Sequence, residues 1–187
     1  METSCSQSPG EHLPDLVLFT ESPEANMSTP QSQATPGLYS IRDSHQMVWV
    51  LEGSSLIAVP SSSNVKPVVI SSLPCTDANV PIEGKGSLIY LGVMDTDLCL
   101  FCAETEGQPT LQLKEKKIMD LYMENEAQLP FLFLHSIEGS TSTFQSVAYP
   151  GWFIATSSEV GQPVILTKER GKTYNTNFFF SSWTGFQ

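Results

Sequence analysis

The sequence has little positive charge. Nine lysines and arginines stand against 20 aspartates and glutamates, which gives a formal net charge of −11 with neutral histidines. Nucleic acids, heparin and anionic membranes are bound by clusters of basic side chains, so this balance argues against all three as partners. The chain also lacks any run of about eighteen consecutive apolar residues, which excludes a membrane-spanning helix. We therefore expect no nucleic-acid partner and no membrane insertion.

Cysteine is also scarce, with four copies in 187 residues. Four cysteines are too few for a disulfide-dense secreted scaffold, and a chain of this length can fold on core burial alone. Cys99 and Cys102 have the spacing of a redox pair, but they lie in an apolar strand, where residues three apart point to opposite faces. We interpret both as reduced core residues, because no second pair is present to complete a zinc site.

The sequence motifs of enzymes are missing as well. With only three histidines, the chain has no His-Glu-x-x-His, and it also has no Gly-x-Ser-x-Gly and no phosphate-cradling glycine loop. The acid pairs Asp95/Asp97 and Glu104/Glu106 flank predicted hairpin turns and are expected to be solvated. We predict that the protein is not an enzyme and holds neither a metal ion nor a cofactor.

The N-terminal segment differs from the rest. Residues 1–41 contain no lysine or arginine, and they carry five acidic residues and five prolines. Such a composition cannot offset the entropy lost on ordering, so residues 1–38 are predicted to form a disordered acidic extension. The segment has no basic start, and its apolar stretch at 13–19 contains Pro14 and Asp15, so we expect no secretory signal peptide. If the protein acts outside the cell, it is made in the cytoplasm and leaves by an unconventional route.

Short apolar runs separated by turn residues follow from about residue 46. Each run is too short for a globular helix and is bounded by Gly, Pro, Ser, Asn or Asp, which is typical of strands. Only residues 114–125 have a composition compatible with a helix, and we expect one short turn there. The predicted strands include residues 47–51, 55–59, 68–70, 88–91, 98–101, 111–113, 131–134, 152–155 and 164–166.

Three parts of this region resemble one another. Gly107-Gln-Pro109 and Gly161-Gln-Pro163 each precede an apolar strand, and a weaker copy ends at Pro67. The three prolines are 42 and 54 residues apart, and an apolar strand opens eleven residues before each of them. Three units of about four strands cannot bury their apolar faces singly, and closing the sheet removes its edges. We predict an all-β fold, a β-trefoil over residues 39–187, with a β-sandwich as the alternative.

Two polar segments stand out as candidate binding loops. Residues 136–143 are rich in Ser and Thr between two predicted strands, and residues 169–177 mix Arg, Lys, Tyr and Asn. Arg and Tyr are enriched where proteins contact one another, and loops on a rigid β scaffold often carry function. Simple connection of strands is the alternative for either segment.

Residues 144–156 (FQSVAYPGWFIAT) closely resemble the signature of the interleukin-1 cytokine family, in which an aromatic residue, a serine and a proline precede an apolar strand ending in Thr or Ser. Residues 97–104 and 166–171 resemble one member of the interleukin-36 subgroup of that family above the others. The resemblance spans residues 39–178 and stops before the aromatic C-terminus, which departs from the family's polar tail and would expose apolar surface. Further stretches similar to the subgroup are residues 41–51, 109–115, 118–122 and 130–133.

The resemblance implies a pro-inflammatory β-trefoil cytokine that binds the interleukin-36 receptor and recruits the interleukin-1 receptor accessory protein, which activates NF-κB and MAP kinase signalling. Members of the family gain full activity when they are trimmed a fixed distance before an aliphatic-x-Asp motif. That motif is Ile41-Arg42-Asp43 here, which places the cleavage between Gln31 and Ser32. The acidic extension would obstruct the receptor surface until it is removed or bypassed on activation.

Receptor contacts in the family come from the N-terminal end of the trefoil and from loops, whereas we assign Trp49, Phe153 and Ile154 to the core. We expect a secreted monomer. An antagonist of the same receptor would share the fold, and a trefoil lectin would be expected to show repeated Gln-x-Trp, which is absent. The candidate receptor-binding residues are Arg42, Asp43, Glu138, Gly139, Lys172, Tyr174, Asn175 and Asn177.

Overall fold

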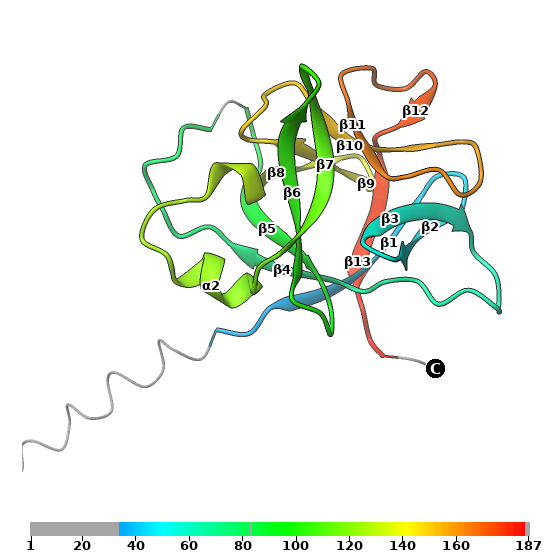
Figure 1. Cartoon of the computed structure of the whole chain (residues 1–187), viewed down its shortest axis with the longest axis horizontal. Helices are drawn as coiled ribbons and strands as arrows, with labels where there is room; N and C mark the ends of the chain where they lie inside the picture. The colour runs from blue at the N-terminus through cyan, green and yellow to red at the C-terminus, as the bar shows by residue number, and fades with distance from the viewer. Residues whose placement is uncertain (1–33, 83, 186–187) are drawn as a thin grey trace, which may run out of the picture. The chain divides into compact units, whose positions relative to one another are not determined.

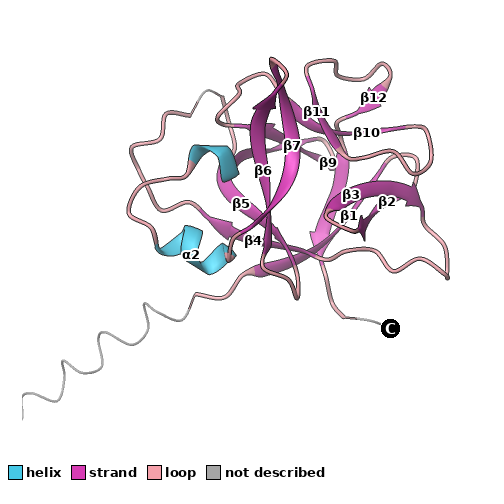
Figure 2. Ribbon diagram, in the orientation of Figure 1, coloured by secondary structure: helices cyan, strands magenta, loops and turns pink. Residues whose placement is uncertain are grey.

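Strands dominate the described part of the chain (Figures 1 and 2), as the short apolar runs predict. The computed structural model describes residues 34–82 and 84–185. The strands of the first half are β1 (Gly37–Asp43), β2 (Met47–Glu52), β3 (Ser55–Pro60), β4 (Ile70–Pro74), β5 (Ser87–Val93), β6 (Leu98–Thr105) and β7 (Gln108–Glu115). Those that follow are β8 (Leu132–Glu138), β9 (Thr141–Ser146), β10 (Phe153–Ser157), β11 (Ile165–Thr167), β12 (Tyr174–Asn175) and β13 (Phe178–Ser182).

Six of these strands close into a ring. β1 pairs with β4, β4 with β5, β5 with β8, β8 with β9, β9 with β13, and β13 pairs again with β1. All of these pairings are antiparallel. Because the last strand returns to the first, none of the six is left with an open edge. A closed barrel is incompatible with the two stacked open sheets of a sandwich.

Three hairpins extend from the ring. β2 pairs with β3, β6 with β7, and β10 with β11. The described chain is therefore three successive units, β1–β4, β5–β8 and β9–β13, and the short strand β12 is an addition that pairs with β10. Backbone hydrogen bonds join the first and third units, where Ala58 N donates to Gln162 O (3.0 Å) and Val164 N donates to Leu56 O (2.9 Å). The predicted β-trefoil is confirmed.

The repeat is more regular than the prolines indicated. Gly53, Gly107 and Gly161 turn the chain between the second and third strands of their units, and they lie at equal intervals of 54 residues. Their φ angles are 62°, 81° and 81°, a region that glycine occupies without steric cost. Pro67 lies between β3 and β4, so aligning the first repeat on it was wrong. The turn does not need a proline, whereas its positive φ favours glycine.

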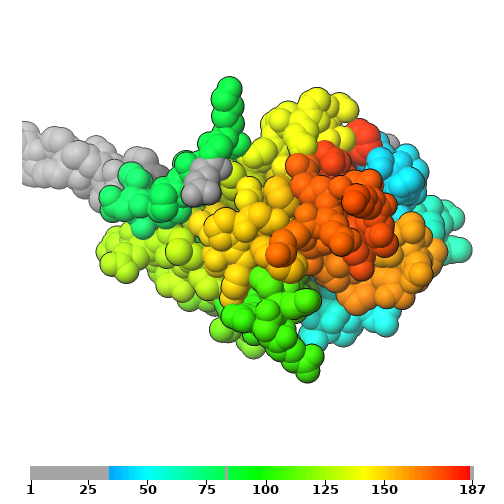
Figure 3. All heavy atoms as spheres, turned by 90° about the horizontal axis from the view of Figure 1, so that it is seen from above, coloured from blue at the N-terminus to red at the C-terminus, as the bar shows by residue number. Residues whose placement is uncertain are grey.

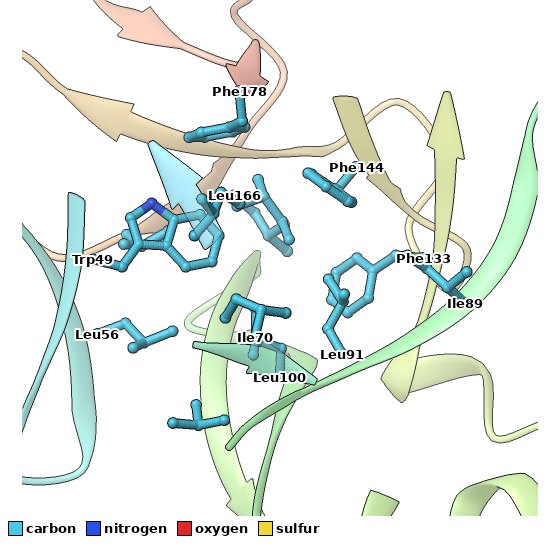
Figure 4. Close-up of a cluster of buried hydrophobic side chains, with 14 of the residues drawn as sticks. Trp49, Leu56, Ile70, Ile89, Leu91, Leu100, Phe133, Phe144, Leu166 and Phe178 are labelled. Atoms are coloured by element: carbon cyan, nitrogen blue, oxygen red, sulfur yellow. The ribbon is translucent and has the colours of Figure 1, made fainter. Parts of the chain in front are cut away.

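The barrel encloses a core to which all three units contribute (Figure 4). Trp49, Phe133, Phe144 and Phe178 are fully buried. The rings of Trp49 and Phe178 meet edge to face, with centroids 5.5 Å apart and planes at 84°. The indole N–H of Trp49 has no oxygen or nitrogen partner in the described part of the chain, and Figure 4 shows it on the side facing Phe178.

The assignments of Trp49 and Ile154 to the core are confirmed, since both are fully buried. Phe153 is only half-buried, so its assignment needs correction. Its ring lies under the Arg170 guanidinium, 4.5 Å from the ring centroid, and faces outward with the polar loop. Neighbouring residues on a strand point to opposite faces, and only Ile154 can therefore point into the barrel.

A second apolar cluster lies beside the barrel. It contains the only α-helix of the described residues, α2 (Ile118–Met123), and the 3-10 turn η3 (Leu129–Phe131). Figure 2 shows both short helices on one side of the strands. Residues 114–115 complete β7, so the helix occupies only the middle of the segment predicted to favour it.

The two cysteines of the redox-like spacing belong to different clusters. Cys102 packs in the barrel core and Cys99 in the second cluster, which confirms that residues three apart on β6 face opposite ways. Both are free thiols. Burial raises the pKa of each thiol to about 12, because a thiolate is poorly solvated there.

The polar segment 136–143 is not a flexible loop. Its residues continue β8 and β9 as a hairpin, and only Gly139 and Ser140 lie between the two strands. Serine and threonine are tolerated here because one face of each strand points away from the core, and Gly139 takes the turn with φ 62°.

The aromatic C-terminus is part of the barrel. β13 pairs with β1 over five residues, and Phe178 enters the core. The ring of Phe180 stacks on Tyr39 at 4.2 Å between centroids. The expectation that this segment exposes apolar surface is therefore wrong for Phe178, which is fully buried, and for Phe180, which is half-buried.

We expect Phe178→Ala to lower the free energy of unfolding by about 3–5 kcal/mol, since it leaves a cavity and removes the ring against Trp49. Urea denaturation followed by circular dichroism measures this. Ile137→Ala is the control, because Ile137 is 68% exposed and should change stability by less than about 0.5 kcal/mol. Equal midpoints for the two variants would contradict the placement of β13 in the core.

Candidate functional site

The two polar segments predicted to bind a partner meet the turn that follows Arg42 and Asp43 on one surface. The β1–β2 turn, the tip of the β8–β9 hairpin and the loop at 169–177 are distant in the sequence but adjacent in space, as Figure 3 shows in blue, yellow and orange. We call this surface the polar rim. Its residues are Arg42, Ser44, Glu138, Gly139, Thr141, Arg170, Lys172, Tyr174, Asn175 and Asn177.

Two asparagines connect the rim. Asn175 Nδ2 donates to Ser44 Oγ at 2.7 Å, which joins β12 to the β1–β2 turn. Asn175 Oδ1 accepts from the backbone N–H of Asn177 at 3.0 Å, and Asn177 Nδ2 donates to Thr141 Oγ1 at 3.0 Å. The 169–177 loop is thus hydrogen-bonded to both neighbouring segments, so these candidate residues are held in one arrangement.

Arg170 fastens the hairpin tip to the loop. Its Nη2 lies 2.8 and 2.6 Å from the two carboxylate oxygens of Glu138, and its Nε donates to Thr176 Oγ1 at 3.1 Å. Phe153 supports the other side of the guanidinium. The two charged side chains are 36% and 41% exposed, so the ion pair contributes little stability, about 0–1 kcal/mol. The ion pair instead holds the tip of the β8–β9 hairpin against the 169–177 loop. Arg170 belongs to the candidate loop 169–177, but it was not singled out among the candidate receptor-binding residues.

Arg42 lies at the edge of the rim, between the barrel and solvent. On β1 it is opposite Phe179, and its guanidinium lies 4.4 Å from the centroid of that ring. Its Nη1 also donates to Gln46 Oε1 at 3.3 Å. Contacts between a guanidinium and an aromatic ring orient the charge without removing it from water. Arg42 is therefore available to a partner, as are the exposed Lys172 and the half-buried Tyr174.

Asp43 lies in the interior, with 1% of its surface exposed. Its Oδ1 accepts from the backbone N–H groups of His45 (2.8 Å) and Met47 (3.0 Å), and its Oδ2 accepts from Thr156 Oγ1 at 2.6 Å. The expectation that this side chain contacts a partner is corrected, since a residue so deeply buried cannot touch one. Ile41 of the same motif is also buried and belongs to the core.

The predicted cleavage position lies outside the described residues. Neither Gln31 nor Ser32 falls in the ranges 34–82 and 84–185, and the same holds for most of the acidic extension. Cleavage at this position stays a prediction. β1 begins at Gly37, five residues after Ser32.

A serine and a histidine do approach each other, but not as a catalytic pair. His135 Nε2 and Ser142 Oγ are 2.7 Å apart. Ser142 is 4% exposed, and the His135 ring stacks on Phe144 at 5.0 Å, so a substrate has no access. Burial also lowers the pKa of His135. Among the residues that the structure describes, no three His, Cys, Asp or Glu side chains gather as metal ligands.

The sequence of residues 76–180 matches the family model described as Interleukin-1 / 18. This span is more than half of the chain. The chain belongs to the interleukin-1 family. Mouse interleukin-36 beta is 54% identical over 170 residues, which cover 91% of this chain and 92% of that protein. It is the subgroup member that residues 97–104 and 166–171 resemble, so that interpretation is confirmed.

A solved structure agrees with the sequence comparison. The NMR structure of the pro-inflammatory cytokine interleukin-36alpha superposes with a TM-score of 0.69 at 49% identity, covering 80% of this chain and 95% of that one. The mouse interleukin-36 receptor antagonist protein is 36% identical over 132 residues, covering 70% of this chain and 81% of that protein. The chain is therefore an interleukin-1-type cytokine of the interleukin-36 group, and not an enzyme. None of the helices in the described ranges is long and apolar enough to cross a membrane.

We expect Thr156→Val to reduce the free energy of unfolding by about 1–3 kcal/mol, because valine keeps the shape but leaves Asp43 Oδ2 without its buried donor. Thermal and urea unfolding measure the change. Thr173→Val, on the exposed loop, is the matched control and should leave stability within about 0.5 kcal/mol of the parent. If both variants unfold alike, the Asp43–Thr156 hydrogen bond is not a significant support of the fold.

Proposed function

We propose that the protein is a pro-inflammatory cytokine that binds the interleukin-36 receptor through the polar rim and recruits the interleukin-1 receptor accessory protein, activating NF-κB and MAP kinase signalling. One observation carries the proposal. Three segments that are up to 131 residues apart are hydrogen-bonded into a single exposed surface. A surface ordered before binding loses less conformational freedom when a partner docks.

The composition of the rim supports a protein partner. It presents Arg42, Tyr174 and Lys172 together with the amides of two asparagines, and arginine and tyrosine are the residues that most often anchor protein interfaces. The rim encloses no buried reactive group. Glu138 and Arg170 neutralise each other, so the surface offers hydrogen bonds and aromatic area together with the positive charges of Arg42 and Lys172.

Antagonism at the same receptor is the second candidate, because the mouse interleukin-36 receptor antagonist protein is also a relative. Agonist and antagonist differ in whether a bound receptor goes on to recruit the accessory protein. The greater similarity to interleukin-36 beta and to the pro-inflammatory interleukin-36alpha favours the agonist. Receptor-bearing reporter cells test this directly, since an agonist raises the signal by itself and an antagonist lowers the signal of an added interleukin-36.

Activation by trimming is part of the proposal. The protein would act outside the cell as a monomer, after export by an unconventional route, and gain activity when cleavage between Gln31 and Ser32 removes most of the acidic extension. Five carboxylates without a single basic residue would, by their bulk and their charge, screen the rim from an approaching partner.

We expect a chain that starts at Ser32 to signal at concentrations at least about tenfold lower than the full chain, an effect of about 1.4 kcal/mol on apparent affinity. Half-maximal reporter activation in receptor-bearing cells provides the measurement. A chain starting at Pro23 keeps one of the five acidic residues and serves as the length control. Equal potency of the Ser32 chain and the full chain would refute the activation step.

We expect Tyr174→Ala to weaken binding to the receptor ectodomain about 5- to 30-fold, because it removes aromatic area at the centre of the rim. Its melting temperature should stay close to that of the parent. Tyr122→Ala in α2, also half-buried but remote from the rim in sequence and element, is the control and should bind normally. A large fall in the melting temperature of Tyr174→Ala would instead assign Tyr174 a structural role.

A further inference from the structure

A polar pocket of about 320 Å³ opens beside the rim. It forms where the β1–β2 turn, the end of β10 and the 169–177 loop meet, and Tyr174 and Asn175 connect it to the rim. Most of the residues that line the pocket have an oxygen atom in their side chain, and no leucine, isoleucine or valine lines it. The side chains that supply the oxygen are those of Ser44, Ser157, Ser158, Thr173, Tyr174 and Asn175.

A buried carboxylate also lines this pocket. Asp43 is 1% exposed, and its three hydrogen-bond donors are two backbone N–H groups and the Thr156 hydroxyl. All three are neutral, and no lysine or arginine in the described ranges lies within ion-pair distance of the carboxylate. A buried charge that is solvated only by dipoles keeps its field, which is less screened than in water.

The other charged or titratable groups that line the pocket are His45 and Lys172, both exposed, and the half-buried Tyr174. None of these side chains forms a hydrogen bond or ion pair with Asp43, so the carboxylate stays without a counter-charge. Hydroxyl oxygens accept hydrogen bonds from ammonium and guanidinium groups, and the Tyr174 ring offers a face to a cation. The pocket thus combines a buried negative charge, hydroxyl groups that accept hydrogen bonds, and an aromatic ring, with the ammonium group of Lys172 on its exposed side.

We propose that this pocket receives a positively charged side chain, a lysine or an arginine, from the cytokine's protein partner. The proposal rests on the receptor-binding role of the rim and names the chemistry that the partner brings to it. Asp43 acts through its charge rather than by contact. The net charge of −11 adds to the same preference, since an acidic protein attracts partners with basic surfaces.

Ser158 offers a direct test of the sign of the partner's charge. It lines the pocket, is exposed, and makes no side-chain hydrogen bond. Ser158→Asp and Ser158→Asn add side chains of the same shape and differ only in charge, while Ser158→Lys adds the opposite charge. The probe is the receptor ectodomain, and surface plasmon resonance measures its Kd for each full-length variant.

Relative to Ser158→Asn, we expect Ser158→Asp to bind about 3- to 10-fold more tightly and Ser158→Lys to bind more weakly by a similar factor. Both differences should shrink between about 50 mM and about 500 mM salt, because salt screens the added charges. The melting temperatures of the three variants should agree. The reverse order of affinities, or equal affinities at low salt, overturns the proposal.

Tyr174→Ala separates failure of this inference from failure of the proposed function. If that variant weakens binding while the three Ser158 variants bind alike, the rim contacts the receptor but the pocket takes no cation. If the parent protein fails to bind the ectodomain at all, the receptor assignment fails and the pocket inference fails with it.

Discussion

The carboxylate of Asp43 is the constraint on which the binding surface depends. It closes the β1–β2 turn by accepting two backbone N–H groups, and it reaches Thr156 on β10, which is 113 residues away in the sequence. This side chain thereby adds to the backbone hydrogen bonds that hold the first and third units of the trefoil together. The segments that carry Ser44 and Asn175 lie next to the Asp43–Thr156 hydrogen bond. The positions of these rim residues therefore depend on Asp43, which is too deeply buried for a partner to touch.

The aliphatic-x-Asp motif is explained by the alternation of a strand. Ile41 and Asp43 point inward, where one fills the core and the other joins the units, while Arg42 points outward and lies against Phe179. In the sequence, Asp43 looks like a candidate contact because it is charged and stands next to Arg42. Burial reverses that interpretation, and only knowledge of the partner strand, which is distant in the chain, could have supplied it.

The fold could be predicted because trefoil symmetry leaves local traces. Short apolar runs marked the strands, and the repeated Gly-Gln-Pro marked the turns of two units. The first unit has Gly53 at the same turn but no proline after it, so a comparison based on proline selects Pro67 instead. Pro67 belongs to the connection between β3 and β4. The C-terminal aromatic run was misjudged for a related reason. Its partners Tyr39 and Trp49 are more than 120 residues away in the sequence. Composition alone cannot distinguish a strand that closes the barrel from a terminal segment that exposes apolar side chains.

The length of the chain before β1 gives the trimming proposal a physical basis. β1 runs for seven residues from Gly37 to Asp43, which separates its first residue from the start of the turn that carries Ser44 by about 20 Å. Residues 32–36 span at most about 17 Å when fully extended, so a stub starting at Ser32 is too short to double back along β1 and cover Ser44 or Asn175. A chain that starts at residue 1 has ample length to do so and carries all five carboxylates with it. In the trimming proposal, the distance between the cut and the motif is then a limit on the reach of the remaining segment, set by the length of one strand.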